Sequence, residues 1–276
     1  MKFISCESSF AAANIVIFGA PYDGTTSNRP GARFAGRAIR AESYGMETYS
    51  PYLDKDLSDF KIHDGGDLEL PFGDPVPVLD MVCDYTKSVL AAEKIPLMLG
   101  GEHLVTLGAF RAVHEKFPQV NIVHFDAHAD LRDEYLGQRL SHATVMRRCY
   151  DLIGDEGVFQ FGIRSGEREE FRWGENHVYT EKFTVKTIPN IIKKLKDKPV
   201  YLTIDLDVLD TGVFPATGTP EAGGISFNEL LNAIEQVSQL NIVGADICEL
   251  SPPYDNTGAS TALACKVVRE LILSLR

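Results

Sequence analysis

The sequence lacks the features of a membrane or secreted protein. No apolar run approaches the roughly 18 residues needed to cross a bilayer, and the first ten residues, MKFISCESSF, contain no sustained apolar region of the kind found in secretory signals. Cysteine is scarce: the chain has five, an odd number, and no two of them are in C-x-x-C spacing. We therefore expect free thiols in a reducing cytoplasm, and neither a disulfide framework nor a membrane partner.

Positive charge is also scarce. The 27 lysine and arginine residues are outnumbered by 39 aspartates and glutamates, which gives a formal net charge of −12. A nucleic-acid-binding protein normally has the opposite balance, so no nucleic-acid partner is expected. The acidic excess is compatible with solubility alone, or with a preference for a cationic small molecule.

The rest of the composition is that of a folded protein, and no repeat, low-complexity tract or linker divides residues 1–276, so a single domain is expected. Apolar runs typical of buried strands are Ile15–Phe18, Pro96–Leu99, Val120–Phe125, Val158–Phe161, Val200–Ile204 and Ile242–Ala245. Helices are predicted at 76–94, 104–116, 226–239 and 261–275, from apolar periodicity or from a capping box. The alternation predicts an α/β fold: a three-layer α/β/α sandwich with a mostly parallel central sheet.

Three of the predicted strands end in acidic residues or histidine. They are followed by Gly100-Gly101-Glu102-His103, by Asp126-Ala-His128-Ala-Asp130 and by Asp205-Leu-Asp207. A single Asp after a strand is usually a turn residue or a helix cap. Because ligands of parallel α/β sheets bind outside the carboxyl ends of the strands, three such segments in one chain indicate a shared site.

The spacing of these residues predicts a metal site. Asp126, His128 and Asp130 alternate along the chain, so in extended backbone their side chains share one face. Carboxylates and imidazoles gathered there would repel one another or be left desolvated without a cation. The four carboxylates, Asp126, Asp130, Asp205 and Asp207, match the charge of two divalent ions, and an oxygen-rich, thiolate-free set favours manganese over zinc. Two such ions can generate hydroxide at neutral pH.

These segments, in this order, resemble those of the ureohydrolases, the family of arginase, agmatinase and formimidoylglutamase. The resemblance spans nearly the whole chain and extends to Ser141–Thr144, Phe214–Pro220 and Asp246–Asp255. The stretch from Asp130 to His142, together with Glu249, is most similar to bacterial agmatinases. The resemblance implies an arginase-like fold and a homo-oligomer, either a trimer or a hexamer.

The resemblance also assigns roles to individual residues. One manganese ion would be held by His103, Asp126, Asp130 and Asp205, and the other by Asp126, His128, Asp205 and Asp207, so that Asp126 and Asp205 bridge. Asp130 and His142 would move a proton, and Glu249 would anchor the guanidinium. From the residues alone, His142 is more often a surface or cap residue, and Glu249 could equally be part of a surface salt bridge. His124 is interpreted as a donor that orients a ligand carboxylate.

The implied reaction is the hydrolysis of agmatine to putrescine and urea, a step in polyamine biosynthesis. Arginine, formiminoglutamate and guanidinobutyrate are alternative substrates, and each carries a carboxylate. Arg132 could pair with such a carboxylate, but an ion pair with Asp133, Glu134 or a neighbouring subunit is the preferred interpretation. The arginase pattern usually has Asn at this position, which argues against arginase.

Two other classes of function stay open at this point. A metal-stabilised structural or regulatory protein would be expected to have lost at least one presumed ligand, and none is missing. A mononuclear zinc deacylase would use fewer carboxylates. Three departures from the family pattern, Ala143, Val145 and Ala216, bear on loop shape and substrate fit and not on metal binding.

Overall fold

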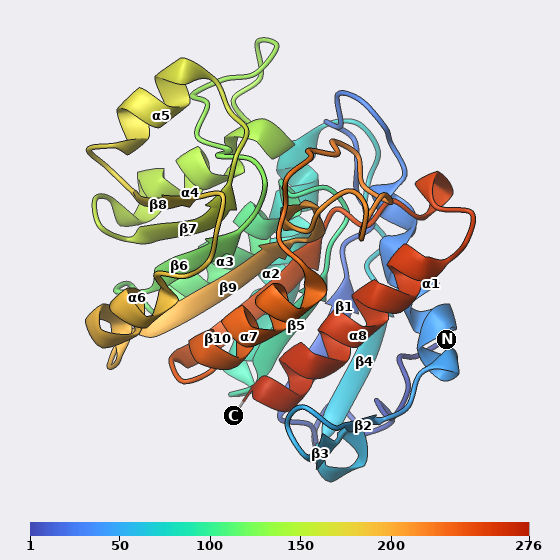
Figure 1. Cartoon of the computed structure of the whole chain (residues 1–276). Coiled ribbons are helices and arrows are strands. Elements are labelled where there is room, and N and C mark those ends of the chain that lie inside the picture. The colour runs from blue at the N-terminus through green and yellow to red at the C-terminus, as the bar shows by residue number, and fades with distance from the viewer. Residues whose placement is uncertain (276) are drawn as a thin grey trace.

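The computed structural model describes residues 1–275, and a sheet of eight parallel strands forms its centre (Figure 1). In sheet order the strands are β4 (Ile62–Asp67), β1 (Ile15–Gly19), β5 (Ile95–Leu99), β10 (Asn241–Cys248), β9 (Pro199–Asp205), β6 (Asn121–Phe125), β7 (Val158–Ile163) and β8 (Tyr179–Lys182). A separate antiparallel pair joins β2 (Tyr49–Ser50) to β3 (Lys55–Asp56).

Helices cover both faces of the sheet (Figure 1). One layer contains α1 (Ala35–Glu42), α6 (Ile188–Leu195), α7 (Phe227–Val237) and α8 (Ala259–Ser274). The other contains α2 (Pro75–Ala91), α3 (Val105–Lys116) and α4 (Val145–Ile153). The short helix α5 (Arg168–Gly174) lies near the edge where the strands end. The predicted three-layer sandwich with a parallel sheet is confirmed.

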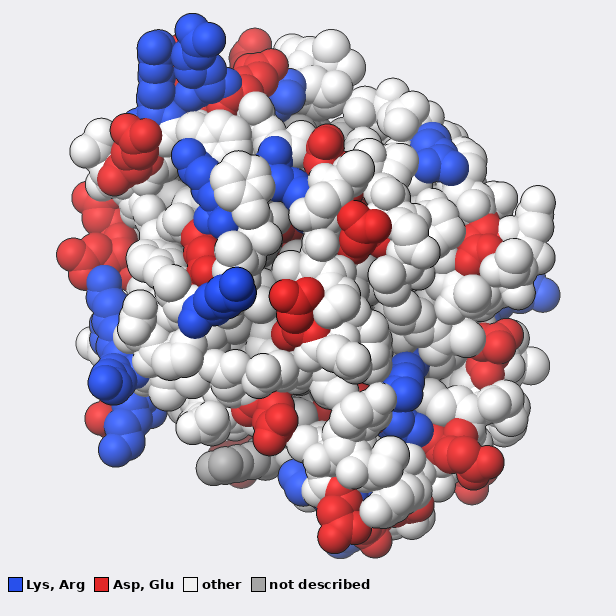
Figure 2. Space-filling view, in the orientation of Figure 1, with Lys and Arg blue, Asp and Glu red and all other residues white. Residues whose placement is uncertain are grey.

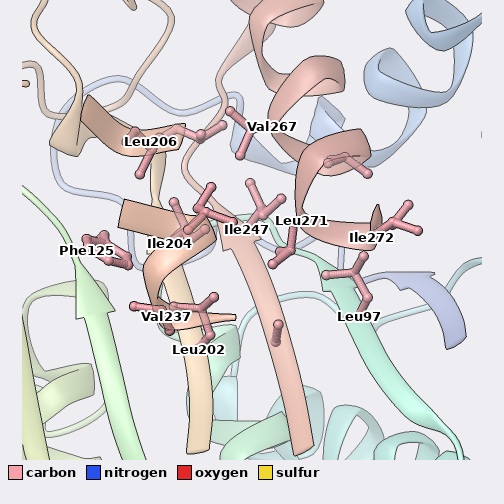
Figure 3. Packing of buried hydrophobic residues seen from close by; sticks show 14 of the residues in the cluster. Leu97, Phe125, Leu202, Ile204, Leu206, Val237, Ile247, Val267, Leu271 and Ile272 are labelled. Atoms are coloured by element: carbon pink, nitrogen blue, oxygen red, sulfur yellow. The ribbon is translucent and has the colours of Figure 1, made fainter. Parts of the chain in front are cut away.

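The core lies on both sides of the sheet because its central strands are apolar on both faces. All residues of β1, β6 and β7 are buried. On one side, Leu202, Ile204 and Ile247 of the sheet lie beneath Val267 and Leu271 of α8 (Figure 3). This burial, repeated along the sheet, is the main apolar contribution to stability and holds the strand ends in register.

The predicted elements are present, with small shifts at their ends, and the elements missed by the sequence pattern are short or peripheral. α7 begins as predicted at a capping box, in which Ser226 and Glu229 each accept the other's backbone N–H. The missed strands β4 and β8 lie at the two edges of the sheet, and their sequences, IHDGGD and YTEK, lack an apolar run. Helices α1, α4, α5 and α6, of seven to nine residues, were also missed.

The distribution of charged side chains and the state of the cysteines are as expected from the sequence. On the face shown in Figure 2, basic side chains are scattered among acidic ones and form no broad positive surface. All five cysteines are buried free thiols. Within residues 1–275, no helix has the length and apolar character required for a membrane span.

Candidate metal centre and substrate pocket

Four adjacent strands at the middle of the sheet carry the predicted site residues at their carboxyl ends. In sheet order, His103 follows β5, Glu249 follows β10, Asp205 ends β9, and Asp126 follows β6. The loops containing them gather along the upper edge of the sheet in Figure 1. Gly101 allows the turn after β5 to pack closely, because a side chain there would collide with the backbone of Tyr22. The sheet therefore brings together segments that are far apart in the sequence.

The first predicted ligand set surrounds one nitrogen of His103. The His103 Nδ1 lies 3.0 Å from Asp126 Oδ2, 3.3 Å from Asp130 Oδ2 and 3.4 Å from Asp205 Oδ2. All four side chains are buried, and Nδ1 makes no hydrogen bond. A buried nitrogen facing three carboxylate oxygens has the donor set of a divalent cation site.

The second set lies on the other side of Asp126. His128 Nδ1 is 2.9 Å from Asp207 Oδ2 and 3.4 Å from Asp126 Oδ1. Asp207 Oδ2 is buried and makes no hydrogen bond. The two oxygens of Asp126 thus face different sets, as a bridging ligand requires. Asp205 is less symmetric, since its Oδ2 faces His103 while its Oδ1 accepts the backbone N–H of Asp207.

The raised pKa values of the clustered carboxyl groups are also consistent with a cation site. Burial and the Asp126 carboxylate raise the pKa of Asp130 to about 7. Burial, Asp207 and Asp126 raise the pKa of Asp205 well above its usual range. Carboxylates this close and this buried resist ionising together, and positive charge between them reverses that tendency. The donor atoms, their burial and their repulsion all match two divalent ions.

Behind the cluster, polar side chains hydrogen-bond to the candidate ligands. The predicted partner His124 lies with Nε2 2.7 Å from Asp126 Oδ2, and Gln160 Nε2 lies 3.0 Å from its other ring nitrogen. His103 Nε2 lies 2.9 Å from the hydroxyl of Thr203, which donates to Asp246 Oδ1 over 2.6 Å. Such partners fix the direction in which ligand lone pairs point.

A cavity of about 270 Å³ opens onto the cluster, and both His142 and Glu249 line it. His142 begins a short 3-10 helix before α4, and its Nε2 lies 3.3 Å from the hydroxyl of Ser27. Burial and nearby His128 lower the pKa of His142 to about 4. Glu249 is 5% exposed, and its Oε1 accepts the backbone N–H of His103 over 2.8 Å. Burial and Glu102 raise the pKa of Glu249 to about 8.

Two of these pocket carboxylates sit on strained backbone. Asp130 has φ of 53° and Glu249 has φ of 66°, a region that residues with side chains adopt at a cost. The strain is maintained by the surrounding structure: the carbonyl of Asp130 accepts the N–H of Arg147, and the N–H of Glu249 donates to the carbonyl of Gly101. Strain at these positions is typical of a functional site.

The outer wall of the cavity is acidic. Arg132 lies there with Nη1 3.0 Å from Glu167 Oε1 and Nε 3.3 Å from Glu170 Oε2, and its guanidinium stacks over the ring of Tyr135. The preferred interpretation, an ion pair, is right, but the partners predicted from the sequence, Asp133 and Glu134, are wrong. Asp133 pairs instead with Arg148, at 2.7 Å.

The sequence analysis missed a loop that contributes Ser27 to the lining of the cavity. The buried carboxylate of Glu102 accepts the N–H and hydroxyl of Thr25 and the hydroxyl of Thr26. The Thr25 hydroxyl in turn accepts the backbone N–H of His142. No local pattern marks this loop. Glu167 could have been found, because it follows β7 in the way that the other site residues follow their strands.

Comparisons with known proteins place the chain among the ureohydrolases. The model of the arginase family matches residues 13–274. An agmatinase of Bacillus cereus is 48% identical over 275 residues, which are 98% of this chain and 95% of that protein. An N(1)-aminopropylagmatine ureohydrolase of Thermococcus kodakarensis is 38% identical over 91% of this chain and 86% of its own. The crystal structure of the agmatine ureohydrolase of Thermoplasma volcanium has a TM-score of 0.91 and 37% identity, covering 99% of this chain and 93% of that one.

Proposed function

The chain belongs to the arginase family of hydrolases, and on that premise we propose that it hydrolyses agmatine to putrescine and urea in polyamine biosynthesis. One water is consumed: its oxygen ends in urea, and one of its protons ends on the leaving amine. The similarity to an agmatinase over almost the full length of both chains supports the reaction class. The cavity described above supports the choice of substrate.

Two divalent cations, manganese being the metal that we favour, would occupy the two ligand sets. His103, Asp126, Asp130 and Asp205 would hold one, and Asp126, His128, Asp205 and Asp207 the other. When bound, such cations lower the pKa of water and so supply a nucleophile at neutral pH.

Glu249 would bind the guanidinium. A guanidinium is planar and presents paired N–H donors, which a carboxylate meets with two parallel hydrogen bonds. Glu249 lies at the inner end of the cavity, beside His103, so its carboxylate would hold the reacting carbon towards the cluster. Binding a cation also favours the ionised carboxylate, against the burial and the Glu102 charge that raise its pKa.

Asp130 and His142 would carry the proton to the leaving amine. Both line the cavity, Asp130 at the cluster and His142 near Ser27. Burial and nearby His128 lower the pKa of His142, so a proton that its imidazole takes up from Asp130 would pass readily to the more basic leaving amine. The Thr25 hydroxyl, which accepts the N–H of His142, holds the backbone of this residue in place.

The observation that carries the choice of agmatine is the charge of the outer wall. Glu167, Glu170 and Arg132 together bear −1, and Arg132 is already paired with both carboxylates. The terminal ammonium of agmatine would be attracted to this wall. The carboxylate of arginine, guanidinobutyrate or formiminoglutamate would meet a net negative charge, and the guanidinium of Arg132, which lines the cavity, is already engaged.

A urea-release screen tests the proposal. Manganese-loaded protein is assayed with agmatine, arginine and guanidinobutyrate, with formiminoglutamate followed through its own product, formamide. We expect kcat/KM to be highest for agmatine. A higher kcat/KM for any of the three acids would refute the substrate assignment and make Arg132 a carboxylate partner after all.

A further inference from the structure

A buried series of hydrogen bonds leads away from His103 and the candidate metal centre. The hydroxyl of Thr203 lies 2.9 Å from His103 Nε2 and 2.6 Å from Asp246 Oδ1. The hydroxyl of Tyr201 donates to Asp246 Oδ2 over 2.6 Å, and the thiol of Cys248 lies 3.4 Å from Oδ1. All five side chains are fully or almost fully buried. Of these five side chains His103 lines the cavity described above, and Thr203, Asp246, Tyr201 and Cys248 are not among its lining residues.

The direction of each hydrogen bond follows from Asp246, at the end of the series farthest from the metal centre. Two hydroxyls and a thiol converge on the Asp246 carboxylate, so this group is the common acceptor. Thr203 has one proton and gives it to Asp246. Its oxygen can therefore only accept from His103, which requires the proton of that imidazole to sit on Nε2. Thr106, whose hydroxyl is 3.5 Å from that of Thr203, is too distant to compete with the 2.6 Å bond.

With the proton on Nε2, the lone pair of His103 is on Nδ1. This nitrogen faces Asp126, Asp130 and Asp205 and makes no hydrogen bond. The opposite tautomer would direct an N–H at the position where a cation would bind, and would prevent ligation. The choice between the tautomers is therefore set two side chains away from the metal centre.

We infer that Asp246 and Thr203 are positioning residues that fix the ligating tautomer of His103, and that they thereby set the affinity of the protein for the cation that His103 holds. The inference rests on the proposal that His103 is a metal ligand. Because the geometry involves only this imidazole, the second cation, beside His128 and Asp207, should be independent of it.

Manganese titration tests this inference, with free Mn²⁺ measured by its electron paramagnetic resonance signal. Thr203→Val removes the acceptor for the Nε2 proton with little change of shape, and Asp246→Asn removes the charge that orients Thr203. Each should weaken one of two bound ions by about 10- to 100-fold and leave the other unchanged. His103→Ala removes the imidazole itself, so the binding site that it weakens identifies the ion held by His103.

Two matched variants separate orientation from general stability. Thr203→Ser keeps the hydroxyl and should bind both ions as the wild type does. Tyr201→Phe removes a different hydrogen bond to the same buried carboxylate, so it should lower the melting temperature without changing either affinity. Thr203→Val or Asp246→Asn binding both ions normally would overturn the inference, as would Tyr201→Phe weakening the ions equally.

The result is independent of the substrate assignment. Failure of the proposed function is observed on the wild type, as fewer than two manganese ions per chain or as poor hydrolysis of agmatine. Failure of the inference is observed in the variants, as normal metal affinity in Thr203→Val or Asp246→Asn or as equal weakening in Tyr201→Phe. A protein that prefers another guanidine could still show that difference, because the tautomer of His103 does not depend on the substrate.

Discussion

Replacing Glu249 by glutamine gives a sharp test of the pocket, because the change preserves shape and removes charge. The Oε1 of Glu249 accepts the backbone N–H of His103, and the amide oxygen of glutamine can do the same. The metal ligands are not altered. Glutamine cannot, however, offer two anionic oxygens to a guanidinium.

The magnitude follows from the burial of the site. Glu249 is 5% exposed, so a guanidinium bound to it exchanges water for a largely desolvated charged hydrogen bond. Losing one such partner costs about 3 kcal/mol, which corresponds to a loss of about 10²-fold in kcat/KM. Stability should be unchanged or slightly higher: burial and the Glu102 charge oppose ionisation of Glu249 and raise its pKa to about 8, and glutamine avoids that cost because it does not ionise.

The assay is urea release from agmatine by Glu249→Gln, with metal content and melting temperature measured on the same preparation. We expect two metals, an unchanged or higher melting temperature, and kcat/KM lower by on the order of 10²-fold. Activity within a few fold of the wild type would show that Glu249 does not touch the substrate. Loss of metal would show instead that it is a ligand or supports one.

Three further outcomes are expected. Asp126→Asn and Asp205→Asn should each reduce manganese well below two per chain by elemental analysis, with Asp126→Asn the more severe because its oxygens face both sets; two retained metals with normal turnover would contradict the assignment. Glu167→Lys should lower the ratio of kcat/KM for agmatine to that for guanidinobutyrate by about tenfold, whereas Glu169→Lys, an equal charge change on a side chain that pairs outward with an arginine, should leave the ratio unchanged. Asp255→Ala removes hydrogen bonds to the first turn of α8 and should cost about 1 kcal/mol at pH 7 by denaturant unfolding of metal-free protein. Because these bonds hold the pKa of Asp255 below its usual range, the stabilisation is present above about pH 4 and lost on acidification, so a difference from the wild type that did not shrink at low pH would refute the linkage.

The fold could be predicted where burial on both faces produces an apolar run. The six predicted strands are the six inner strands of the sheet, since a strand covered by helices on both sides must be apolar throughout. β4 and β8 were missed because each has only one neighbouring strand and carries polar side chains. Edge strands pair through backbone groups, which leave little trace in the sequence.

The clustering of the candidate ligands could be predicted because they come in short, closely spaced segments. Asp126, His128 and Asp130 lie within five residues. The structure brings Asp126 and Asp130 to His103, and His128 to Asp207. The sequence could not show which carboxylate oxygen faces which set. That depends on the order β5-β10-β9-β6 in the sheet, which is not the order in the chain.

The partners of Arg132 show why the remaining contacts could not be predicted. Neighbours in sequence, Asp133 and Glu134, were the obvious choices, but the segment after β6 turns so that Asp133 reaches Arg148 on α4. Arg132 meets instead two carboxylates that follow β7, the adjacent strand. Salt bridges outside a helix are set by which strand ends lie side by side, and that is a property of the assembled sheet. The acidic wall that we propose to favour a cationic tail is therefore a consequence of tertiary structure, although every residue in it is visible in the sequence.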